Sequence, residues 1–96
     1  MKKMIFTWDE RKATANLQKH GVTFTDAAAV FRDPHCLTIQ DRFENGEYRW
    51  QTIGYSRGVI LLLVAHTCSD ENGNELIRIT SARRATKAER KRYEHD

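Results

Sequence analysis

The sequence predicts an α+β fold, in which a small antiparallel sheet carries two N-terminal helices on one face and is followed by a C-terminal helix. Helix signals occur only near the two ends of the chain, and residues 36–82 between them read as strands. Turn residues interrupt that stretch at three places, which predicts four strands there. The expected order is β-α-α-β-β-β-β-α, and 96 residues suffice for one domain, which we expect to span 1–96.

The first part of the chain contains a strand and two helices. Met4–Trp8 is apolar enough for a short first strand. Asp9 is a suitable N-cap for the helix that follows, and Gly21 can adopt the left-handed conformation that ends many helices. A second helix is expected from Thr25. It should stop before Pro34, because the residue preceding a proline disfavours helical geometry.

The remaining elements are four strands and a last helix. The strands are expected at Cys36–Gln40, Arg49–Tyr55, Val59–Thr67 and Leu76–Ala82. Asn45-Gly46 and Asn72-Gly73 are typical of tight hairpin turns. Thr86 and Glu89 have the spacing of a capping box, which predicts a final helix from Lys87 to about Glu94.

Alternation along the last predicted strand places an arginine on the uncovered face of the sheet. Ile77, Ile79 and Ser81 would share one face, and the isoleucines should meet the helices. Arg78 and Thr80 would then point to the other face. With Arg49 on another strand, this face would form a shallow cationic site, although the stem of Arg78 could equally serve to cover apolar surface.

Basic residues are concentrated at the C-terminal end of a chain whose formal charge is +3. Residues 78–96 contain seven Lys and Arg residues and three acidic ones, whereas residues 1–77 contain nine and ten. Such a basic block suits a polyanion, because phosphates attract Lys and Arg and release counterions on binding. The alternative is an ordinary solvated helix face.

Several classes of protein are disfavoured by composition. Two cysteines, Cys36 and Cys68, provide neither a disulfide framework nor a four-ligand zinc site, and the histidines are scattered, so we expect no metal. The longest apolar run, Val59 to Ala65, is too short to cross a membrane. The apolar stretch near the N-terminus is also too short for the core of a signal peptide, which favours a cytoplasmic protein.

Several stretches of the sequence form a pattern that covers nearly the whole chain in order, although each stretch is weak alone. They are Phe6-Thr7-Trp8-Asp9 with Lys12-Ala13 and Asn16; Lys19 to Phe24 with Ala27-Ala28; Val30 to Pro34; Asp41-Arg42 with Gly46-Glu47 and Arg49; Ile53 to Ser56; and Ile77 to Ala85 with Glu89-Arg90 and Tyr93. In these stretches the sequence resembles BrnT-type toxins, the ribonuclease components of bacterial type II toxin–antitoxin pairs, which have a RelE-like fold.

This resemblance implies an activity and a set of partners. It implies cleavage of RNA without a cofactor, and inhibition of translation and growth. It also implies a BrnA-like antitoxin, a ribbon-helix-helix protein through which alone the toxin would reach operator DNA. We expect toxin and antitoxin to form a hetero-oligomer of even symmetry.

Metal-free cleavage of RNA requires a base for the 2′-hydroxyl, an acid for the departing 5′-oxygen and cations for the phosphorane. The candidates for a catalytic role are Glu47, Arg49, His66, Arg78 and Arg83. Arg83 is the preferred candidate of all, since it directly follows an apolar strand in the stretch with the strongest resemblance. Glu47 and His66 are both candidates for proton transfer, and which of them is the base and which is the acid is left open. Further residues expected to bind the substrate are Arg42, Arg84 and Lys87.

Two readings without catalysis remain open from the residues. One is a nucleic-acid-binding module, in which the basic C-terminal segment contacts phosphates and Tyr93 stacks on bases. The other is a subunit whose basic surface only binds an acidic partner. RNA length after long incubation separates the ribonuclease from the binder, and affinity for RNA at low salt separates the binder from the docking subunit.

Overall fold

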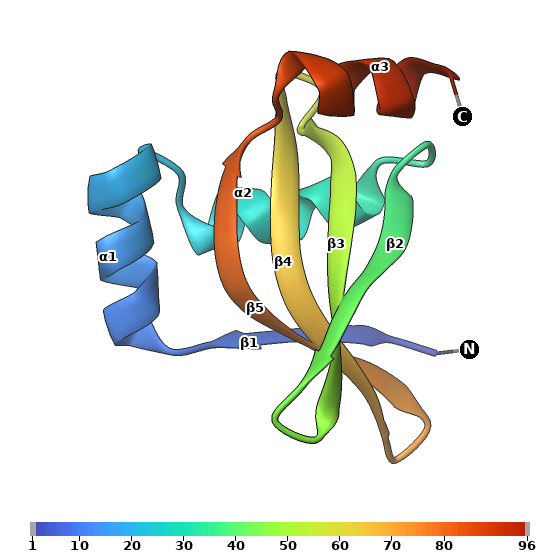
Figure 1. Ribbon diagram of the computed structural model, residues 1–96. Coiled ribbons are helices and arrows are strands. Elements are labelled where there is room, and N and C mark those ends of the chain that lie inside the picture. The colour runs from blue at the N-terminus through green and yellow to red at the C-terminus, as the bar shows by residue number, and fades with distance from the viewer. Residues whose placement is uncertain (1, 96) are drawn as a thin grey trace.

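The computed structural model describes residues 2–95 and contains a five-stranded sheet with three helices (Figure 1). The sheet order is β1-β5-β4-β3-β2. The elements are β1 (Met4–Trp8), α1 (Glu10–His20), α2 (Phe24–Ala29), the 3-10 turn η1 (Val30–Arg32), β2 (Leu37–Glu44), β3 (Glu47–Ser56), β4 (Ile60–Glu71), β5 (Asn74–Arg84) and α3 (Lys87–His95). The predicted fold class and element order are confirmed.

One strand pair in the sheet is parallel. β1 runs parallel to β5, and every other neighbouring pair is antiparallel, so the sheet is mixed rather than wholly antiparallel as expected. The reason is the path of the chain. After β1 it passes through α1 and α2 to the far edge of the sheet, and the four-strand meander from β2 then returns to β1 with β5 in the same direction.

The residues predicted to begin and end the first helix do so in the structure. Asp9 caps α1, and Gly21 ends it in the left-handed conformation, with its N–H bonded to the carbonyl of Leu17. α2 begins one residue earlier than predicted, because Thr23 caps it through its hydroxyl. Among residues 2–95, no helix is both long and apolar enough to span a bilayer.

The strands extend further than the sequence patterns suggested. β4 reaches Glu71 and pairs with β5 through polar residues close to the Asn72-Gly73 turn. His66 therefore lies inside a strand, where the prediction had it at a strand end. Backbone pairing continues beyond the last buried side chain, and hydrophobic alternation cannot reveal that extension.

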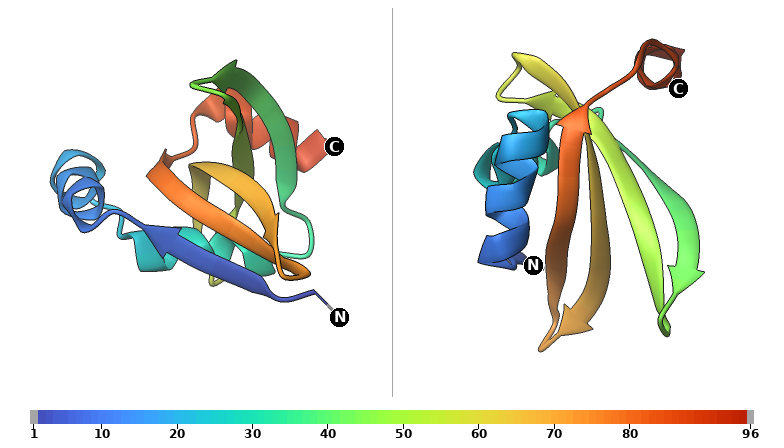
Figure 2. Two further views of the ribbon diagram at one scale, coloured as in Figure 1. Left: turned by 90° about the horizontal axis from the view of Figure 1, so that it is seen from below. Right: turned by 60° about the vertical axis from the view of Figure 1, so that its left-hand side comes forward.

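The two faces of the sheet are covered differently (Figure 2). α1 and α2 cover one face, where the main core contains Phe24, Val30, Leu62 and Ile77 among others. We call the opposite face the open face. Only α3 lies over it, near one end, above a small cluster of Ile53, Leu61 and Leu63. The rest of the open face is therefore available to polar side chains.

A β-bulge in β5 changes which residues face the helices. Ala65 pairs with Ser81 while His66 pairs with Ile79, so Thr80 is the extra residue. Ala82 therefore joins Ile79 in the main core, and the prediction that Ser81 shares their face is wrong. The same shift brings Arg83 onto the open face, opposite Leu63 of β4. In an unbroken strand, Arg83 and Arg78 would point to opposite faces.

The buried side chain of Asn16 holds α1 to β5 at this bulge. Its amide nitrogen donates to the carbonyls of Val22 (2.9 Å) and Ala82 (2.8 Å), and its oxygen accepts the N–H of Ala82 (3.0 Å). β1 pairs with β5 only as far as Ile79. Asn16 thus provides hydrogen-bond partners for the backbone of β5 beyond the last residue that pairs with β1.

Replacing Asn16 with Ala is expected to lower the free energy of unfolding by about 3 kcal/mol, since it leaves the N–H and carbonyl of Ala82 buried without partners. Urea denaturation measures the change. The exposed Gln18 on the same helix provides the control, because Gln18→Ala should change stability by less than about 0.5 kcal/mol. Equal effects of the two substitutions would contradict the role given to Asn16.

Candidate active site

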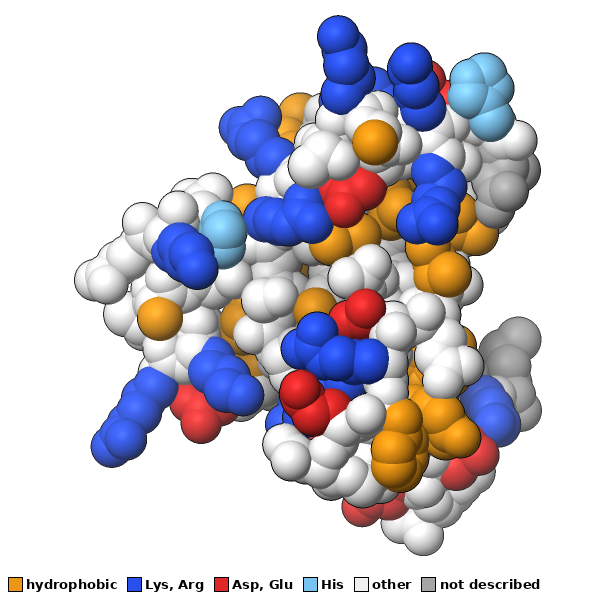
Figure 3. Space-filling view, viewed as in Figure 1, with side chains coloured by type: hydrophobic (Ala, Val, Ile, Leu, Met, Phe, Trp, Pro, Cys, Tyr) orange, Lys and Arg blue, Asp and Glu red, His pale blue; other side chains and the backbone are white. Residues whose placement is uncertain are grey.

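A carboxylate between two arginines occupies the open face. Arg78 of β5 donates from Nη2 to Oε1 of Glu47 over 2.7 Å, and Arg49 of β3 lies 3.3 Å from the same oxygen. Glu47 and Arg49 share the open face with Ile53, since even spacing along a strand keeps side chains on one face. Figure 3 views this face and shows basic and acidic side chains gathered over the middle of the sheet.

Arg42 and Glu44 extend this group across the β2–β3 hairpin. Arg42 lies directly opposite Arg49 in the strand pairing, a position where like charges repel. Glu44 lies between them, 3.4 Å from Nε of Arg42 and 4.0 Å from Nε of Arg49. We call these five side chains the arginine–glutamate cluster: Arg42, Glu44, Glu47, Arg49 and Arg78.

Arg49 is the most enclosed member of the cluster. Its side chain is 19% exposed, and among the described residues its Nε is the one buried side-chain nitrogen or oxygen without a hydrogen-bond partner. Leaving a guanidinium N–H unpaired is costly, and such groups call for a structural or functional explanation. A site that is completed by an anionic ligand provides one.

A cavity of about 200 Å³ opens beside Glu47 and Arg78, with Thr7, Tyr48 and Thr67 in its lining. Tyr48 is 53% exposed and packs edge-to-face against the 60% exposed Phe43, with ring centroids 4.9 Å apart. By strand alternation both rings leave the hairpin on the face opposite the cluster, but Tyr48 also lines the cavity that Arg78 borders. An exposed ring beside a guanidinium group suits a nucleic acid, whose bases stack while its phosphates pair with cations. The sequence prediction missed Glu44, Phe43 and Tyr48, although their position around Asn45-Gly46 was a usable signal.

Arg83 lies on the open face but outside the cluster. Its Nη1 and Nη2 each donate to Glu89 of α3 over 2.9 Å, forming a bidentate pair. These hydrogen bonds from Arg83 lower the pKa of Glu89, despite the opposing effect of burial. Arg83 and Arg78 pair with Leu63 and Thr67 of β4, and these partners are four residues apart, which is about 13 Å at the usual rise. The geometry therefore gives Arg83 a role in holding α3.

A second set of contacts fixes the far end of α3. The hydroxyl of Tyr93 donates to Asp33 over 2.6 Å, and Asp33 also accepts the N–H of Tyr55. Burial and the bond to Asp33 raise the pKa of Tyr93 to about 12. Burial alone would raise the pKa of Asp33, but the hydrogen bonds from Tyr55, Tyr93 and His35 hold it below its usual range.

His66 lies on the other side of the sheet. It is buried in the helix-covered face, where it packs against Phe31 and its Nε2 is 2.8 Å from the hydroxyl of Thr52. Burial lowers the pKa of His66 and so favours its neutral form. The structure does not bring His66 to Glu47 or to the arginines, because even-numbered residues of β4 face the helices.

The remaining two residues predicted to bind substrate also lie away from the cluster. Arg84 pairs with Leu62, so its side chain leaves the strand on the helix-covered side and is exposed at the end of β5. Lys87 is the exposed first residue of α3. Of the eight predicted site residues, the structure thus joins Arg42, Glu47, Arg49 and Arg78 in one cluster.

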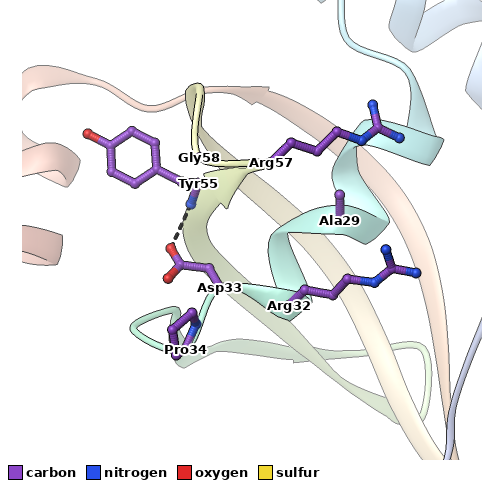
Figure 4. Close-up of a pocket in the computed structure, with 7 residues that line it drawn as sticks. All are labelled: Ala29, Arg32, Asp33, Pro34, Tyr55, Arg57 and Gly58. Carbon is purple, nitrogen blue, oxygen red and sulfur yellow. Dashed lines mark hydrogen bonds between the residues drawn. The ribbon is translucent and has the colours of Figure 1, made fainter.

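Another cavity, of about 430 Å³, lies between η1 and the β3–β4 turn (Figure 4). Arg32 and Arg57 extend to one side of it, and Tyr55 points away from them. Arg57 is paired with Asp26 over 2.6 Å, and Asp33 is occupied by its donors. Two of the three charged residues that line this cavity are thus paired within the chain, and Arg32 is the third. The cavity brings no carboxylate to two arginines as the open face does, so it is a weaker candidate.

Metal ligands are not gathered in the part of the chain that the structure describes. Within residues 2–95, no three His, Cys, Asp or Glu side chains lie together as a metal site would need. The two glutamates of the cluster contact arginines instead.

Comparisons with known proteins bear on the family and the fold. The family model described as ribonuclease toxin, BrnT, of type II toxin–antitoxin system matches residues 8–89. The 1.1 Å crystal structure of the Brucella abortus ribonuclease toxin BrnT is similar to the chain, with a TM-score of 0.64 and 23% identity over 88% of this chain and 99% of that chain. At that identity the likeness shows the fold. No curated protein matches significantly.

Acid is expected to release α3 before it unfolds the sheet. Folding lowers the pKa of Glu89 and Asp33 below the unfolded values of about 4.3 and 3.9. Their contribution is therefore complete above about pH 5 and is lost as the pH falls through the folded values. Hydrogen-exchange protection factors of α3 amides should fall between pH 6 and pH 3, while those of β4 persist.

The control for this experiment removes the titrating group. In the variant Glu89→Gln, the α3 amides should be less protected from exchange at pH 6 than in the natural chain. Their protection should also fall by less on acidification, because one carboxylate no longer titrates. If protection of α3 and β4 fell together in the natural chain, local release of α3 would be ruled out.

Proposed function

Because this chain belongs to the BrnT family of ribonuclease toxins of type II toxin–antitoxin systems, we propose that it is an endoribonuclease that cleaves RNA on the open face of its sheet. The observation that carries this proposal is the pairing of Glu47 with both Arg49 and Arg78. These groups are a carboxylate for proton transfer and two guanidiniums for phosphate, and they come from β3 and from β5, with β4 between those strands.

In the first step, the phosphate of the RNA replaces the carboxylate of Glu47 as the partner of Arg78. A guanidinium stays charged and forms paired hydrogen bonds with phosphate oxygens. The scissile phosphate can therefore take over the donors of Arg78 that Glu47 now accepts. Arg49, which is held more rigidly by its burial, stabilises the charge that develops on the phosphorane.

The exchange frees the carboxylate of Glu47 to act as the base. Glu47 removes the proton of the 2′-hydroxyl, the 2′-oxygen forms a bond to phosphorus, and the bond from phosphorus to the 5′-oxygen breaks. The protonated Glu47 is then the nearest acid and passes its proton to that leaving oxygen. The products are a 2′,3′-cyclic phosphate and a 5′-hydroxyl, and no metal enters the sequence. His66 has no part, because it is buried on the other face.

Other residues bind the RNA around the cleaved bond. Arg42 is exposed at the rim of the cluster, and Phe43 and Tyr48 offer rings for base stacking. Arg84 and Lys87 contribute positive potential near α3, where they can contact phosphates outside the cleavage site. Arg83 is a positioning residue, because it acts through Glu89 to hold α3 over the sheet.

The partner of such a toxin must cover its cleavage site. We expect the antitoxin to place an acidic and apolar segment on the open face, where it would pair with the arginines of the cluster. We expect this antitoxin to be a ribbon-helix-helix protein of BrnA type that binds operator DNA. Toxin and antitoxin would together form a hetero-oligomer of even symmetry. Cleavage of RNA in the cytoplasm would stop translation and growth until this partner is present.

Substituting Arg78 is expected to remove cleavage without unfolding the protein. Arg78→Ala should lower kcat roughly 100- to 1,000-fold, since it removes a cation that stabilises transition-state charge. The matched control is Arg57→Ala, which also removes an arginine paired with a carboxylate, but at a distant turn. Cleavage of a labelled RNA and thermal unfolding of each variant provide the measurements.

The outcome decides between catalysis and binding alone. If the natural chain binds RNA with strong salt dependence but leaves its length unchanged, both with and without ribosomes, the protein is a binding module. If Arg57→Ala impairs cleavage as much as Arg78→Ala, the reaction does not occur at the cluster.

The chemistry of the cut is expected to follow from attack by the 2′-oxygen. An RNA with a single 2′-deoxy sugar at the cleaved position should be uncut there, and the natural product should carry a 2′,3′-cyclic phosphate detectable by mass spectrometry. Addition of EDTA should leave the rate within about two-fold, because charge stabilisation comes from guanidinium groups. A 5′-phosphate product, or a rate restored only by a divalent cation, would contradict the mechanism.

A further inference from the structure

Arg78 borders two cavities rather than one. The first, described above, lies towards Glu47 and Tyr48. The second has a volume of about 280 Å³ and lies towards α1, where Lys12 lines it. Thr7 and Arg78 line both cavities, so the two adjoin and form one groove along the border of β1 and β5. No site residue predicted from the sequence lies in its second half apart from Arg78 itself.

Lys12 is the cation that this second cavity offers to a ligand. Asp9 also lines the cavity, but its carboxylate is committed to capping α1, since it accepts the N–H groups of Arg11 and Lys12 over 2.8 and 3.3 Å. The hydroxyl of Thr80 is likewise occupied, as it donates to the carbonyl of Ala65. The side chain of Lys12 is exposed on the first turns of the helix and can reach an anion in the cavity.

Aromatic and cationic side chains both line the groove. Tyr48 lies in the first cavity, Trp8 and Lys12 lie in the second, and Arg78 borders both. The ring of Trp8 packs against the main core and edge-to-face with Phe24, so Trp8 forms a wall of the second cavity, whereas Tyr48 is 53% exposed and offers its ring to a base. An exposed ring beside cations is typical of single-stranded nucleic-acid grooves, and it favours RNA over an acidic peptide, which would have no bases to stack.

The size of the second cavity sets how much RNA it can hold. The volume of about 280 Å³ is slightly below the usual lower limit of ligand pockets, about 300 Å³, so the cavity has room for no more than one nucleotide. Arg78 would then contact the cleaved phosphate at one end of that nucleotide. Lys12 would contact the phosphate at its other end.

We propose that the cavity between Lys12 and Arg78 is a subsite for the nucleotide adjoining the cleaved bond, with Lys12 binding its outer phosphate. This proposal rests on the proposed function, because it uses the cleavage site to orient the RNA. It assigns Lys12 to substrate binding and Thr7 and Trp8 to the walls of the subsite. Lys12 takes no part in the chemical step.

The test compares Lys12→Ala with Lys19→Ala, an exposed lysine at the other end of the same helix. On a labelled RNA, Lys12→Ala is expected to raise KM about 5- to 10-fold, to leave kcat within about two-fold and to reduce the salt slope of binding by about one. Lys12→Arg should restore the natural KM. Lys19→Ala should behave as the natural chain.

A second arm removes the phosphate in place of the lysine. RNAs with one uncharged methylphosphonate at each position around the cut are tested in turn. At one position adjoining the cleaved phosphate, the natural chain and Lys12→Ala should give equal KM values, because the contact is already missing. Equal effects of Lys12→Ala at every methylphosphonate position would overturn the proposal, as would a fall in kcat with KM unchanged.

The binding arm separates this proposal from the proposed function. Affinity for the same oligonucleotide with 2′-O-methyl sugars, which cannot be cut by 2′-oxygen attack, is measured by fluorescence anisotropy. If the natural chain cuts no RNA yet Lys12→Ala weakens this binding and Lys19→Ala does not, the groove survives and the catalytic proposal fails. If the oligonucleotide binds equally to both variants and only an acidic antitoxin peptide loses affinity, the nucleotide subsite is refuted.

Discussion

The hydrogen bonds between Asn16 and Ala82 are the constraint on which the arrangement of the open face depends. β5 has a partner strand on its outer edge only up to Ile79, and beyond that point the amide of Asn16 serves as the partner. The bulge at Thr80 lies within this change of partner. It turns Ala82 into the core and Arg83 towards the open face, so a single buried side chain determines both where α1 packs and where α3 is held.

Repulsion among the arginines explains why the cluster contains glutamates. Arg42 and Arg49 lie opposite each other, and Arg78 approaches the same region from β5. Without anions, these like charges would destabilise the β2–β3 hairpin. Glu44 and Glu47 offset two of these three positive charges in the free protein, and a phosphate would add to that compensation in the complex. The protein therefore holds its guanidinium groups in a binding geometry before RNA arrives, which reduces the reorganisation required during reaction.

Local signals in the sequence predicted the elements, and long-range pairing determined the site. The Thr86–Glu89 capping box forms as expected, with Thr86 N–H and Glu89 Oε1 2.8 Å apart, because all of its atoms lie within one helical turn. Ser81 was assigned to the wrong face because the bulge depends on contacts with Asn16, far away in the sequence. Arg83 was ranked first for catalysis on its place after an apolar strand, but its partner Glu89 becomes visible only once α3 folds back over the sheet.

The arginine–glutamate cluster lies on the part of the open face that none of the described helices covers. α3 reaches only one end of this face, through Tyr93, with Ala85 of the connection before it, and the apolar cluster beneath is small. Strands β3, β4 and β5 continue past that cover, and their side chains there must remain compatible with water. Arginines meet this need, because their stems cover strand backbone while their charged ends stay hydrated or paired. The part of the open face that α3 does not cover is thus the part where a polyanion can bind.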